Sequence, residues 1–67
     1  MIINFNVNDV SWNAPIHQLN GDVLRRHVLI NGKVDSLDLN FTYCEATEKG
    51  IITDSKNQQI GHFSIID

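Results

Sequence analysis

Between Asp22 and Tyr43 the chain reads DVLRRHVLINGKVDSLDLNFTY, with the pair Asn31-Gly32 set between two largely apolar runs. Asn-Gly in such a place is a strong hairpin signal, because both residues of a type I′ turn must accept positive φ. A two-residue turn collects apolar side chains on one face of the hairpin and sets Arg25 beside Asp38 on the other. The pattern therefore favours a hairpin over residues 22–44.

A short helix is the competing interpretation of residues 22–30. Asp22 can cap it, apolar side chains recur at helical spacing, and Asn31-Gly32 can end it. We favour the strand, because the β-branched Val28 and Ile30 prefer a pleated surface. The helix stays open as the alternative.

The N-terminal part of the chain divides into a strand and a loop. Residues 2–8 alternate isoleucine, phenylalanine and valine with asparagine, which is the period-two pattern of a half-buried strand. Residues 9–21 lose that period and hold Pro15, so we expect a loop there, with room for one helical turn around residues 12–19.

The C-terminal part predicts two further strands, at residues 51–53 and 58–66, with Gly61 marking a bulge or a close backbone approach. Together the patterns predict one compact domain over residues 1–67. It is mostly β, a small rolled sheet, barrel or sandwich of about five antiparallel strands. If residues 22–30 are helical, the fold is instead α+β with one short helix.

Composition narrows the classes of partner and compartment. The 67 residues carry five Lys and Arg against eight Asp and Glu, a net charge of −3, which argues against a broad surface for duplex nucleic acid. The single Cys44 allows no intrachain disulfide and favours a reducing, cytoplasmic compartment. No export signal and no stretch of about 20 apolar residues is present, so we expect no membrane association.

Reactive side chains show no motif that is diagnostic of a reaction or a ligand. His17, His27, Cys44 and His62 stand 10, 17 and 18 residues apart, without the short paired spacings of structural zinc sites. We therefore expect no metal and no cofactor. Cys44 with His62 as its base would make a thiol-dependent enzyme, but a lone cysteine at a strand end is usually a packing residue, so we expect no enzyme.

Elimination leaves binding as the expected function. We predict a small non-enzymatic protein-binding or regulatory protein whose partner is another protein, including itself as a homodimer. Nine isoleucines beside eight asparagines suggest an AT-rich coding sequence, and hence a phage or mobile-element accessory protein that modulates a host protein. Trp12, Arg25, Arg26 and Tyr43 are the predicted binding residues, since Trp, Tyr and Arg dominate binding hot spots. Arg25, Arg26 and Tyr43 also suit the alternative, a small β-barrel for single-stranded nucleic acid.

Overall fold

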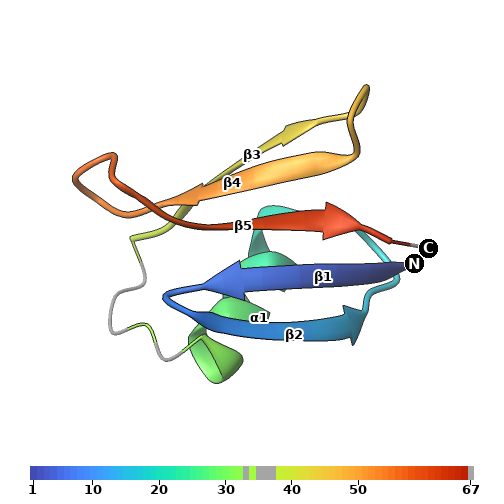
Figure 1. Ribbon diagram of the computed structural model, residues 1–67, viewed down its shortest axis with the longest axis horizontal. Coiled ribbons are helices and arrows are strands. Elements are labelled where there is room, and N and C mark those ends of the chain that lie inside the picture. The colour runs from blue at the N-terminus through green and yellow to red at the C-terminus, as the bar shows by residue number, and fades with distance from the viewer. Residues whose placement is uncertain (33, 35–37, 67) are drawn as a thin grey trace.

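The computed structural model describes residues 1–32, 34 and 38–66 and contains one open antiparallel sheet with one helix on its face (Figure 1). Along the chain these elements are β1 (Ile2–Val7), β2 (Val10–Pro15), α1 (Gly21–Asn31), β3 (Asn40–Cys44), β4 (Lys49–Thr53) and β5 (Gln59–Ile65). The strand order is β2-β1-β5-β4-β3, and all neighbours are antiparallel. The prediction of a mostly β fold with five antiparallel strands is confirmed. The sheet is not closed into a barrel.

The α1 helix replaces the first strand of the predicted hairpin, so the competing interpretation is right and the favoured one is wrong. Asn20, rather than Asp22, caps the helix: its side chain accepts a hydrogen bond of 2.9 Å from the Val23 N–H. This bond satisfies one of the backbone donors that every helix start leaves free. Asp22 lies in the first turn, where a carboxylate stabilises the helix dipole.

At the C-terminus of α1 the Asn31-Gly32 pair ends a helix and does not form the predicted hairpin turn. The Gly32 N–H donates to the Val28 carbonyl at 2.8 Å, and the φ angle of Gly32 is −88°, so the pair ends a helix without a positive-φ turn. Leu24 and Val28, one turn apart, are both buried. Their burial outweighs the modest strand preference of β-branched residues.

Among the described residues, no helix is both long and apolar enough to cross a lipid bilayer.

The second strand of the predicted hairpin lies partly outside the described residues, which omit 33 and 35–37. Its described part is β3, which pairs with β4 and not with residues 22–30. Because those residues are helical, the register that set Arg25 beside Asp38 does not form.

A second correction concerns residues 9–21, where β2 takes the place of the expected loop. Asn8 and Asp9 form a tight turn with φ angles of 48° and 69°, and β2 then pairs with β1 from Val10 opposite Val7 to Pro15 opposite Ile2. Asn and Asp tolerate the left-handed region better than other non-glycine residues, which makes this short connection possible.

Gly61 marks both features that the sequence predicted at that position. The β4–β5 register runs from Ile52 opposite Gly61 to Thr53 opposite Gln59, which leaves Ile60 as the extra residue of a bulge. A Cβ atom at Gly61 would also collide with the Asn6 carbonyl of β1. The prediction of a bulge or a close approach is therefore confirmed.

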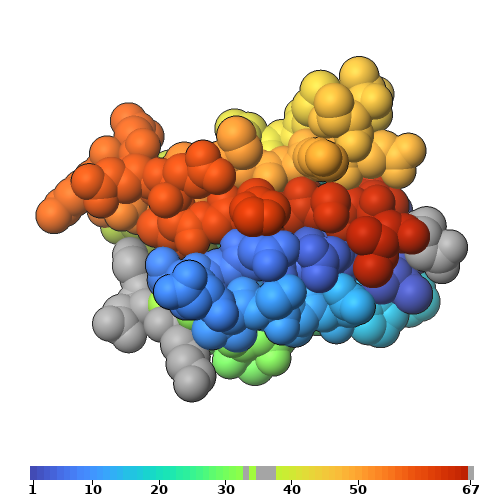
Figure 2. Space-filling view, viewed as in Figure 1, coloured from blue at the N-terminus to red at the C-terminus, as the bar shows by residue number. Residues whose placement is uncertain are grey.

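The core lies between the sheet and α1, and the other face of the sheet is not covered by the helix. Figure 1 shows α1 behind β1 and β2, so the face turned to the viewer there and in Figure 2 is the one away from α1. We call it the outer face. The largest fully buried side chains are Phe5, Phe63, Ile3, Ile52, Val7 and Val28.

Candidate functional site

The structure does not bring the four predicted binding residues onto one surface. Trp12 lies on β2 and Tyr43 on β3, which are the two opposite edges of the sheet. Arg25 and Arg26 lie next to each other on α1, where Arg26 is exposed and Arg25 half-buried.

Trp12 serves the core. Its ring stacks on Phe5 with centroids 5.0 Å apart and an interplanar angle of 12°. The indole nitrogen is buried and makes no hydrogen bond within the described residues. Trp12 is partly buried and packs against the core, so part of its ring is already covered inside the molecule.

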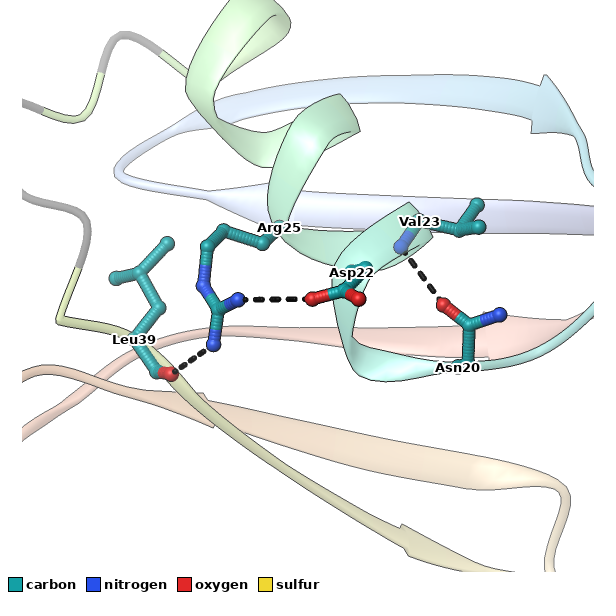
Figure 3. Close-up of polar contacts among 5 residues, drawn as sticks. All are labelled: Asn20, Asp22, Val23, Arg25 and Leu39. Carbon is teal, nitrogen blue, oxygen red and sulfur yellow. Dashed lines mark hydrogen bonds and ion pairs between the residues drawn. The ribbon is translucent and has the colours of Figure 1, made fainter.

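Arg25 connects the helix to the chain that enters β3 (Figure 3). The Nη1 atom of its guanidinium donates to the Asp22 carboxylate at 3.2 Å, and the Nη2 atom donates to the Leu39 carbonyl at 3.5 Å. The ion pair is exposed and weak, since Asp22 is 85% exposed. Its structural consequence is that a cation sits beside the first residue of β3, Asn40.

Tyr43 lies at the rim of the core and remains 37% exposed. Its ring stacks on Phe63 at 6.2 Å with an interplanar angle of 11°. The pKa of the Tyr43 phenol is raised, first because its surroundings desolvate the phenolate and then because the carboxylates of Glu48 and Glu45 repel it.

β3 has only β4 as a neighbour among the described strands, so one side of its backbone has no partner strand there. The Thr53 hydroxyl of β4 donates to the Asn40 carbonyl at 3.5 Å, which places that carbonyl on the β4 side. Because backbone groups alternate along an antiparallel strand, the N–H and C=O groups of Phe41 and Tyr43 point away from β4. We call these groups, with the side chains of residues 40–44, the β3 edge.

The five residues of β3 carry none of the sequence features that usually protect an edge strand. Such strands carry a charge, a proline or a bulge that prevents another strand from pairing with them. The sequence of β3 is NFTYC, with no charge, glycine or proline, whereas β2 at the opposite edge ends in Pro15, which has no N–H. Phe41 adds an aromatic ring that packs edge-on against Phe63 at 6.4 Å. Sequence reasoning recognised this strand but could not tell that it lies at an edge.

A groove of about 450 Å³ lies on the outer face, mainly over β4 and β5. Its lining comes from four elements and the β3–β4 turn: Asn4, Cys44, Thr47, Lys49, Gly50, Ile51, His62, Phe63 and Ser64.

The pKa of the Cys44 thiol is lowered, mainly because the Thr47 side chain and the Thr47 and Ala46 N–H groups donate hydrogen bonds to the thiolate. The Thr47 hydroxyl also lies 3.5 Å from the Cys44 carbonyl, a second and long contact.

Cys44 and His62 share this groove without forming a dyad. Cys44 lies on β3 and His62 on β5, with β4 between them, and the register places His62 opposite Ile51 and Ile51 opposite Thr42. Two strand spacings and two residues of rise separate the Cα atoms of Cys44 and His62 by roughly 12 Å. A thiol needs its base within hydrogen-bond distance, so the register gives no support to a thiol-dependent enzyme.

The described residues contain no group of three or more His, Cys, Asp or Glu side chains that could hold a metal ion. Comparisons with protein-family models, curated proteins and solved structures found no match for this chain. Its function is therefore inferred from the geometry of these surfaces.

Proposed function

We propose that this chain binds another protein, by adding an extended strand of that protein to the β3 edge. The observation that carries the proposal is an unprotected, uncharged edge strand whose Phe41 and Tyr43 backbone groups point away from the sheet. An extended segment laid along such an edge gains main-chain hydrogen bonds, and neighbouring side chains supply specificity. The half-buried ring of Phe41 and the exposed part of the Tyr43 ring would supply that side-chain contact.

The same site supports single-stranded nucleic acid less well. The carboxylates of Glu48 and Glu45 disfavour the Tyr43 phenolate, and they would disfavour a phosphate group beside this ring for the same reason. The chain also carries a net charge of −3, with five Lys and Arg against eight Asp and Glu. We therefore keep protein binding as the proposal, with a phage or mobile-element protein that modulates a host protein as its finer version.

Selection from a random dodecapeptide library displayed on phage tests the proposal without a known partner. We expect selected peptides, once synthesised, to shift the amide NMR signals of Phe41 and Tyr43 in the labelled chain. Tyr43→Pro removes an outward N–H while keeping the β4 pairing, so it should weaken peptide binding by about tenfold or more. Tyr43→Ala is the matched control, because it loses the same ring and keeps the N–H.

Two results would contradict the proposal. The first is that selected peptides shift signals on α1 or β2 and leave those of β3 unchanged. The second is that Tyr43→Pro binds them as well as Tyr43→Ala does. A fluorescently labelled thymidine 20-mer, titrated at two salt concentrations, tests the nucleic-acid alternative, and we expect no binding even at low salt.

A further inference from the structure

We infer that the strand added at the β3 edge is β3 of a second copy of this chain, antiparallel to the first and with the two-fold axis at Thr42. This inference rests on the proposed function and names the partner for the same edge. It follows from three properties of β3: the direction of its free backbone groups, the symmetry of its side chains, and the charges at its two ends.

The backbone groups fit this register. With the axis at Thr42, Phe41 lies opposite the partner's Tyr43, and Tyr43 lies opposite the partner's Phe41. These are the residues whose N–H and C=O groups point away from β4, so each pair can exchange two hydrogen bonds. Thr42 then faces the partner's Thr42 as a non-hydrogen-bonded pair, in which side chains approach closely.

The side chains are also self-complementary. Phe41 and Tyr43 lie on the core side of the sheet, where each already contacts Phe63. Pairing sets the Phe41 ring beside the partner's Tyr43, and aromatic pairs across strands favour association. The exposed part of Tyr43 would be covered by this contact, and the uncharged β3 places no like charges opposite each other.

The charges at the two ends of β3 select the antiparallel orientation. Arg25 sits at the start of β3 through its contact with the Leu39 carbonyl, and Glu45 directly follows the strand. In the antiparallel register Leu39 lies opposite the partner's Glu45, which brings Arg25 close to that carboxylate. A parallel arrangement would instead bring Glu45 close to the partner's Glu45. Opposite charges across an interface favour the first arrangement.

Analytical ultracentrifugation of charge variants tests the axis. We expect the wild type to dimerise and its unfolding midpoint to rise with protein concentration. Thr42→Lys and Thr42→Glu should each raise the dimer dissociation constant by about tenfold or more, because like charges meet at the axis. A mixture of the two variants should recover the dimer. Ile51→Lys is the matched control, since Ile51 is 43% exposed and lies one strand away from the axis, opposite Thr42 on β4.

Disulfide trapping tests the register independently. With Cys44→Ser in the background, Thr42→Cys should cross-link rapidly on mild oxidation, because the Cα atoms of a non-hydrogen-bonded pair are about 4.5 Å apart, within the range for a disulfide. Ile51→Cys in the same background should not. A wild type that stays monomeric at millimolar concentration would overturn the inference. So would a mixture of charge variants that associates no better than either variant alone.

The outcomes separate this inference from the proposed function. A monomeric wild type whose Phe41 and Tyr43 signals still respond to selected peptides refutes the second copy and keeps strand addition. A wild type that stays monomeric and whose β3 signals do not respond to any peptide refutes both.

Discussion

Replacing Asn20 by alanine tests whether residues 21–31 form a capped helix, which is the point on which the two predicted folds differ. The Asn20 side chain accepts a hydrogen bond of 2.9 Å from the Val23 N–H at the helix start. Removing such a cap costs about 1 kcal/mol, within a range of about 0.5 to 2 kcal/mol. For a domain of this size the melting temperature should fall by about 4–8 °C. The free energy of unfolding is expected to be only about 3 to 10 kcal/mol, so the loss is easily measured.

Urea unfolding followed by far-UV circular dichroism measures this loss, at one fixed protein concentration because self-association would shift the midpoint. Asn20→Asp is the matched control: it keeps an acceptor oxygen and adds a favourable charge at the helix start, so its stability should equal or exceed that of the wild type. Asn20→Gly should lose only a few tenths of a kcal/mol.

The hairpin interpretation makes a different forecast for the same variants. There Asn20 would be an ordinary surface residue of a loop, and its replacement would change stability by less than about 0.5 kcal/mol. An Asn20→Ala variant as stable as the wild type would therefore refute the capped helix. A loss in Asn20→Asp as large as that in Asn20→Ala would refute the role of the acceptor oxygen.

Two further predictions use contacts elsewhere in the molecule. Gly61→Ala should destabilise the protein by about 1–3 kcal/mol in urea unfolding, because its Cβ would collide with the Asn6 carbonyl, whereas Gly21→Ala meets no atom within 4 Å and should be neutral or stabilising. Equal stability of the two variants would contradict the close approach of β5 to β1. Thr47→Val should raise the pKa of the Cys44 thiol by removing a hydrogen bond to the thiolate, so the rate of alkylation by iodoacetamide should rise at higher pH than in the wild type. An unchanged pH profile would show that the hydroxyl does not bind the sulfur.

Strands whose pattern is local were predictable. Ile3, Phe5 and Val7 alternate with polar residues because one face of β1 is buried and the other is not, so its pattern and its burial agree. The Gly61 bulge was predictable for a similar reason, because a glycine inside a strand often marks a backbone that approaches another closely.

Residues 22–32 were ambiguous because the same local signals suit two structures. Asn31-Gly32 can turn a hairpin or end a helix, and Val28 suits either a pleated surface or a buried helix face. The choice depends on whether Leu24 and Val28 can reach a common apolar surface, and that surface is made by distant strands such as β1 and β5. The same limit applied to β2, whose short pairing depends on β1 as much as on its own residues.

The amino-acid order alone was enough to establish an uncharged, aromatic segment at residues 40–44, a lone cysteine and a chain poor in cations. Only the folded chain shows that β3 lies at an edge, that Trp12 and Tyr43 lie at opposite edges of the sheet, and that Arg25 lies beside Leu39. The physical reason is the separation along the chain of the residues that interact. Side-chain periodicity records which face of one strand is buried, whereas an edge is defined by which strands, far apart along the chain, become its hydrogen-bonded neighbours.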